Sequence, residues 1–132
     1  MTETVDRFTI RFPARPGYLR VSRLNAAAIG AAAGLDVDQL DDLRLAVNEA
    51  VTWLLADEDA GGELELALQA IDGTVQIELA RTGSDLPRRA LDGLIEAILA
   101  VTVDQFELHE QTNHRRAITM STSSQPNARS DA

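Results

Sequence analysis

Residues 63–80 read ELELALQAIDGTVQIELA and carry the strongest local hairpin signal in the chain. In both halves of this stretch, large apolar residues alternate with polar or small ones: Leu64, Leu66, Leu68, Val75, Ile77 and Leu79. Asp72-Gly73 lies between the halves, and this dipeptide favours the tight turn of a hairpin. The stretch therefore predicts two antiparallel strands, each with one apolar face.

Upstream of the hairpin, the sequence predicts one strand and two helices. Residues 7–12 alternate with a period of two, which is typical of a half-buried strand, and the strand ends at Pro13. From Tyr18 to about Gly34 the period changes to three or four and predicts a helix. Its predicted core stripe is Val21, Leu24, Ala28, Ala31 and Leu35. A second helix begins at a capping Asp36 or Asp38, and its predicted core stripe is Leu40, Leu43, Val47, Val51 and Leu54.

Downstream, we expect a third helix and a last pair of strands. The third helix has an apolar stripe of Leu91, Leu94, Ile95, Ile98 and Leu99. The strands are expected at residues 103–110 and 116–121, around a turn at 111–114. The order β-α-α-β-β-α-β-β predicts an α+β fold, a two-layer α/β sandwich with an antiparallel or mixed sheet. We expect one domain over residues 7–121, a flexible segment at 1–6 and a disordered tail at 122–132.

Composition narrows the possible functions. The 132 residues include 21 acidic and 12 basic side chains, for a net charge of −9, and no cysteine. This charge disfavours binding to nucleic acid or anionic membranes. All basic residues are arginines, so no P-loop lysine is present. The sequence shows no membrane-spanning stretch and no secretion signal, so we expect a cytoplasmic protein. His109 and His114 lack a suitably spaced carboxylate, and we expect no metal site.

The second helix is expected to be packed or bound on two sides. Its stretch Asp42–Trp53 reads DLRLAVNEAVTW, and the side opposite the core stripe carries Leu45, Glu49, Thr52 and Trp53. A solvated surface acid is the simplest interpretation of Glu49. A functional carboxylate is the alternative.

The run Leu45–Thr52 and the order of elements resemble the bacterial RsbW-like anti-sigma factor kinases of the GHKL, or Bergerat, ATPase superfamily. In that family a glutamate on this helix acts as general base, and an asparagine one turn later holds magnesium. Glu49 and Thr52 match the family pattern. Trp53 stands in place of the asparagine, and an indole offers no lone pair to a magnesium ion.

The remaining nucleotide motifs of the family are degenerate in this chain. Arg81 replaces the aspartate that accepts the adenine amino group, and a guanidinium cannot accept a hydrogen bond. Gly83 is kept, but Asp85 replaces the next glycine. Only a few residues separate Gly83 from the third helix, so the ATP lid is missing, and Gly93 alone remains of the second glycine box. The resemblance therefore implies a relative without a nucleotide cofactor, with Mg-ATP binding as the alternative.

We predict that Trp53 and Arg81 fill the space where nucleotide would lie. The predicted positions leave room for an ion pair between Arg81 and Glu49 beneath the indole. Arg88-Arg89 and Arg115-Arg116 are interpreted as surface charges or partner contacts.

The resemblance also implies a function and partners. The leading hypothesis is an anti-sigma factor-like regulator, active in a stress or developmental programme, that binds a sigma factor and a STAS-type antagonist, and that forms a homodimer. The start of the first helix would form the partner surface: Arg20 first, then Arg15, Tyr18 and Arg23. Two alternatives are an active serine kinase with Glu49 as base, and a scaffold module that retains only the fold.

Overall fold

The computed structural model describes residues 6–57, 61–83, 85–109 and 111–124. Its secondary structure follows the expected order. The elements are β1 (Asp6–Pro13), the 3-10 helix η1 (Pro16–Tyr18), α1 (Leu19–Ala32), α2 (Val37–Leu54), β2 (Glu63–Ile71), β3 (Thr74–Thr82), α3 (Gly93–Thr102), β4 (Gln105–Leu108) and β5 (Arg115–Ser123).

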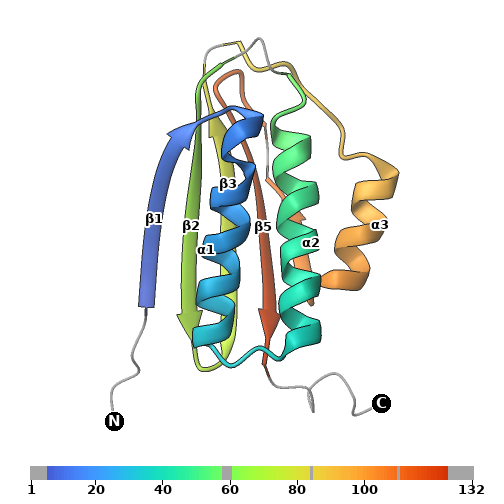
Figure 1. Ribbon diagram of the computed structural model, residues 1–132. Coiled ribbons are helices and arrows are strands. Elements are labelled where there is room, and N and C mark those ends of the chain that lie inside the picture. The colour runs from blue at the N-terminus through green and yellow to red at the C-terminus, as the bar shows by residue number, and fades with distance from the viewer. Residues whose placement is uncertain (1–5, 58–60, 84, 110, 125–132) are drawn as a thin grey trace.

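The strands form one five-stranded sheet in the order β1-β2-β3-β5-β4, and every neighbouring pair is antiparallel. The central hairpin has the predicted two-residue turn: Ile71 pairs with Thr74, and both turn residues have positive φ, 50° at Asp72 and 79° at Gly73. This geometry matches a type I′ turn, which fits the twist of the flanking strands. The helices cover one face of the sheet and leave the other uncovered (Figure 1). The predicted two-layer α/β sandwich is therefore confirmed, with a fully antiparallel sheet.

α2 lies at the centre of the helical layer, between α1 and α3 (Figure 1). Asp36 caps its first turn, because the Asp36 carboxylate accepts from the Gln39 backbone and the Gln39 side chain accepts from the Asp36 backbone. The predicted stripe of α2 faces the core: Leu43, Val47, Val51 and Leu54 are buried, and Leu40 is half-buried. These residues pack with the leucines of β2 and β3.

The predicted core stripe of α1 is wrong in phase, although the helix itself is confirmed. Leu24 is 62% exposed, and Ala28 and Ala31 are exposed as well. The buried side consists of small residues with one large one: Ser22, Ala26, Ile29 and Gly30. A Cβ atom on Gly30 would lie only 2.9 Å from Leu40 Cδ2. Because the two helices pack closely at this glycine, the small residues turn inward and Leu24 turns outward.

The C-terminal part differs from the expectation in three details. α3 begins at Gly93, where the Asp92 carboxylate caps Leu94 N–H, and Leu94 itself is exposed although it was placed on the core face. β4 is shorter than predicted. β5 extends to Ser123 with Thr122 buried, two residues beyond the expected end of the domain. Residues 1–5 and 125–132, most of the two predicted flexible ends, lie outside the described residues.

Within the described ranges, no helix has both the length and the apolarity needed to cross a membrane.

Candidate functional site

The residues aligned with the nucleotide motifs lie at one end of the sandwich. The C-terminal end of α2, the end of β3 and the connection from β3 to α3 meet there (Figure 1). A group of charged and aromatic side chains joins these segments, and Arg81 and Trp53 are its most buried predicted members.

The Arg81 side chain binds the C-terminal end of α2. Its side chain is fully buried: Nη1 donates to Leu54 O at 2.8 Å, Nη2 donates to Asp57 O and Gly61 O at 2.8 Å, and Nε donates to Gly61 O at 3.1 Å. The last carbonyl groups of a helix lack intrahelical partners, and the negative end of the helix dipole favours a cation. Burial, followed by repulsion from Arg116, lowers the pKa of the Arg81 guanidinium from its ordinary value. Arg81 is thus held as a helix C-cap.

Trp53 fills the space between α2 and the connection that leads into α3. Its side chain is buried, and its Nε1 donates to Ala90 O at 3.0 Å. The Cζ atom of Arg116 lies 5.5 Å from the centroid of the Trp53 ring. This distance is within the range of a cation–π interaction, which is stronger when both groups are removed from water.

Asp57 binds two guanidinium groups beside the indole. Arg89 donates from Nη2 to Asp57 Oδ1 at 2.8 Å and from Nε to Oδ2 at 3.2 Å, a two-pronged geometry. Arg116, only 1% exposed, donates from Nη2 to Asp57 Oδ2 at 3.1 Å and to the Pro87 carbonyl. The hydrogen bond from Arg89, aided by the one from Arg116, holds the pKa of the Asp57 carboxyl below its usual range even though burial opposes this shift. Reciprocally, Asp57 raises the pKa of Arg89.

We call Asp57, Arg81, Arg89 and Arg116 the arginine clasp. The clasp holds the short connection between β3 and α3 against the end of α2. Gln111 adds to this attachment, because its side chain accepts from Arg89 N at 3.0 Å and donates to Arg89 O at 2.6 Å. The connection is therefore fixed by side-chain hydrogen bonds at the position where the family has its ATP lid.

The structure corrects two predictions about these residues. Arg81 does not pair with Glu49, because its guanidinium donates to the backbone carbonyl groups of Leu54 and Asp57 at the end of α2. Arg116 is not a surface charge, because it is buried and binds Asp57. Arg89 is half-buried and binds the same carboxylate. Sequence reasoning missed Asp57. Its only local signal was its position just after a predicted helix end.

The remaining motif residues lie around the clasp. Glu49 is half-buried on α2, and the exposed Thr52 donates from Oγ1 to Asn48 O at 2.7 Å. Gly83 N donates to His114 O at 3.0 Å, and Asp85 is exposed with φ of 60°.

At the start of α3, a backbone N–H group is bound by the capping residue Asp92. Asp92 Oδ1 accepts from Leu94 N at 2.7 Å. A helix N-terminus is the usual place for a phosphate group, because its N–H groups and dipole attract anions. In this chain a carboxylate already lies at the start of the helix that follows the lost glycine box, next to Gly93.

The predicted partner residues gather at the beginning of α1. Arg15, Tyr18 and Arg20 are exposed, and Arg23 is half-buried. A hollow of about 330 Å³ lies here, lined by Pro16, Gly17, Leu19, Arg20, Val21, Arg23 and Leu24. We call Arg15, Tyr18, Arg20, Arg23 and Leu24 the α1 surface. It combines exposed apolar groups with arginines on a chain whose net charge is −9. Leu24 was missed because it was assigned to the core.

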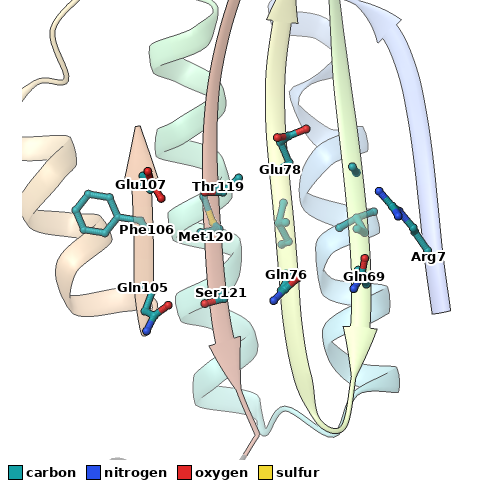
Figure 2. Close-up of a pocket in the computed structure, with 13 residues that line it drawn as sticks. Arg7, Gln69, Gln76, Glu78, Gln105, Phe106, Glu107, Thr119, Met120 and Ser121 are labelled. Carbon is teal, nitrogen blue, oxygen red and sulfur yellow. The ribbon is translucent and has the colours of Figure 1, made fainter. Parts of the chain in front are cut away.

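A second hollow lies far from the clasp, on the uncovered face of the sheet (Figure 2). Its volume is about 430 Å³, and the labelled side chains that line it are mostly polar: Arg7, Gln69, Gln76, Glu78, Gln105, Phe106, Glu107, Thr119, Met120 and Ser121. Nearby, His109 Nε2 lies 3.1 Å from Thr119 Oγ1. Among the described residues, no group of three His, Cys, Asp or Glu side chains is arranged to hold a metal ion.

Comparison with known proteins agrees with the fold. Residues 12–122 match the family described as Histidine kinase-like ATPase domain. The serine-protein kinase RsbW of Bacillus pumilus is 28% identical over 112 residues, which cover 80% of this chain and 69% of that protein. RsbW of Listeria monocytogenes serotype 4a is 38% identical over 82 residues, which cover 60% of this chain and 52% of that protein.

Several of these curated relatives are matched over only about half of their length, 52% for RsbW of Listeria innocua serovar 6a. Among solved structures, the RsbU and RsbW domains of Rv1364c from Mycobacterium tuberculosis share the fold with a TM-score of 0.64 at 17% identity, covering 89% of this chain and 32% of that chain. The family match covers most of the chain and the relatives carry one common name. The chain therefore belongs to the histidine kinase-like ATPase domain family, and its sequence is similar to RsbW proteins.

Proposed function

We propose that this chain is an anti-sigma factor-like regulator that binds its protein partners without a nucleotide. The observation that carries the proposal is the burial of Trp53 and Arg81 at the positions where the family holds magnesium and adenine. Both side chains donate hydrogen bonds to backbone carbonyl groups of the protein itself. Nucleotide would have to displace both of them and break the arginine clasp.

The proposed partners are a sigma factor and a STAS-type antagonist, and the proposed contact is the α1 surface. Exposed Arg20 and Tyr18 lie beside the hollow at the start of α1, together with Leu24. The ring of Tyr18 packs against the ring of Phe12, and the two ring centroids are 6.2 Å apart. Aromatic and arginine side chains are enriched at protein interfaces, and a basic surface on an acidic protein selects an acidic partner surface. Homodimer formation, a cytoplasmic location and a role in a stress response complete the proposal.

A serine kinase is the second candidate, supported by the half-buried Glu49 at the general-base position and by the names of the relatives. A calorimetric titration of the full chain with ATP and ADP, with and without magnesium, separates the two. We expect no saturable heat at submillimolar nucleotide, because the acceptor and the metal ligand are absent and the space is filled. A magnesium-dependent saturable signal near micromolar would contradict the proposal and favour the kinase.

Partner binding separates the regulator from a scaffold module. Sigma factors and STAS-type proteins encoded in the same genome would be purified and tested individually against the full chain. We expect at least one of each class to form a stable complex in the absence of nucleotide. If none of them binds, the anti-sigma proposal fails and only the fold has been retained.

A further inference from the structure

α3 exposes apolar side chains although one of its sides packs on α2. Leu94 is 70% exposed and Val101 is 78% exposed, and Ala97 between them is also exposed. Their spacing of three and seven residues places all three on one stripe of the helix. Glu96 is the only charged residue among the ten residues of α3. Such a stripe on a water-soluble surface is a typical mark of an interaction site.

The outward side of α2 continues this apolar surface. Leu45 is 43% exposed and lies on the side of α2 opposite the buried Val47 and Leu54, which face the sheet. α3 runs beside α2 in the opposite direction (Figure 1). The buried residues of α3 are Leu99 and Thr102, and the Leu94 stripe lies on a different side of the helix. We infer that this stripe faces solvent on the same side of the helical layer as Leu45.

Acidic side chains border the apolar groups. Asp42 and Glu49 lie within one turn of Leu45 on α2. The helical repeat puts them between Leu45 and Trp53, whose Nε1 donates to Ala90 O just before α3, so they lie on the side of α2 toward α3. Arg44, the residue before Leu45, is paired with Asp41 at 2.8 Å. We call Asp42, Leu45, Glu49, Leu94, Ala97 and Val101 the α2–α3 face. It presents the apolar stripe of α3, with the negative charges of Asp42 and Glu49 between this stripe and Leu45 on α2.

The charge of this face decides which occupant fits. A second copy would bring its own acids against these, and like charges across a contact oppose binding. An anionic membrane is repelled for the same reason. A helix whose apolar stripe is flanked by basic side chains matches both features, because its stripe covers the leucines while its cations meet Asp42 and Glu49.

We propose that the α2–α3 face is a docking surface for an amphipathic helix of a partner protein, with basic residues flanking its apolar stripe. The proposal is independent of the function proposed above, because the α1 surface is basic and belongs to a different helix. The two surfaces fit partner segments of opposite charge.

The test uses a synthetic amphipathic peptide with a leucine stripe flanked by lysines, labelled for fluorescence anisotropy and titrated with the full chain. We expect saturable binding that weakens as salt is added. The double variant Leu94→Ser/Val101→Ser should bind at least about tenfold more weakly, and Asp42→Arg should also weaken binding. All three residues are exposed, so circular dichroism should show an unchanged fold. The matched control is Val37→Ser, which removes an equally exposed apolar side chain (73%) outside the face.

Three results of the peptide titrations would overturn the proposal. The double variant binds as the wild type does; Val37→Ser weakens binding as much as the double variant; or a peptide with glutamates in place of the lysines binds equally well. Sedimentation of the chain alone tests the competing occupant, because self-association lost in the double variant would assign the face to a second copy. Arg20→Glu should leave peptide binding unchanged, which keeps failure here distinct from failure of the α1 surface.

Discussion

At the scale of single residues, Asp57 supplies the only negative charge of the arginine clasp. Its carboxylate is the acceptor for Arg89 and for the buried Arg116. Removing one partner of a buried ion pair leaves the other charge uncompensated and costs about 3 kcal/mol. We therefore expect Asp57→Asn to lower the free energy of unfolding at neutral pH by about that amount, measured by urea denaturation. Asp85→Asn, which changes an exposed carboxylate, should cost nothing measurable.

The same residue sets a dependence on pH. The pKa of Asp57 is lower in the folded protein than in the unfolded chain, so its contribution to stability is complete above the unfolded pKa of about 3.9 and is lost as the pH falls through the folded value. The wild type should lose stability in acid faster than Asp57→Asn, and the difference between the two should shrink below about pH 4. A difference that stays constant with pH would show that the ion pairs do not contribute.

Arg20 is the residue that tests partner recognition. Because its side chain is exposed, Arg20→Glu should change folding stability by no more than about 0.5 kcal/mol. Placing like charges together at an interface can cost several kcal/mol of binding, so complexes with sigma factor or antagonist should weaken strongly in calorimetry. The unfolding control is Ile29→Asp, since Ile29 is buried and Leu24 is not. Normal binding by folded Arg20→Glu would remove the α1 surface from the proposal.

At the scale of elements, the approach of the segment before β2 to the end of β3 depends on one glycine. Gly62 has φ of +87°, and a Cβ atom there would lie 2.0 Å from Thr82 O. Gly62→Ala should therefore lower the free energy of unfolding by about 2 kcal/mol or more, measured by thermal unfolding. Gly61→Ala is the matched control, because Gly61 also has positive φ, +62°, but nothing lies within 4 Å of its Cβ position. Its cost should be limited to the strain of about 1 kcal/mol. Equal losses would mean that the contact with β3 is unimportant.

The elements also show what a sequence pattern can predict. The turn at Asp72-Gly73 was predicted to the residue, and a two-residue turn fixes the register of both strands. The helical period of α1 was predicted, but the side that faces the core was not. α1 and α2 pack closely at Gly30, which favours small residues on the buried side of α1. The local sequence pattern of α1 gives no sign of this close packing. For α2 the predicted stripe of Leu43, Val47, Val51 and Leu54 is buried, so period and phase agreed.

At the scale of the whole molecule, the candidate site was only partly predictable. Trp53 and Arg81 could be singled out because each breaks a motif of the family. Arg89 and Arg116 could not, because they reach Asp57 from segments separated by 32 and 59 residues. A surface arginine and a buried one look the same in a sequence. The acid that pairs with them is visible only once the chain has folded.

The burial of Trp53 also allows the arginine clasp to be monitored by tryptophan fluorescence. Trp53 is the only tryptophan of the chain, so all indole fluorescence comes from the space beneath Arg116 and Ala90. A ligand that entered this space would have to move the ring toward water, and the emission would shift to longer wavelength. Opening of the site can thus be followed in the unlabelled protein, during a nucleotide titration or on addition of a partner.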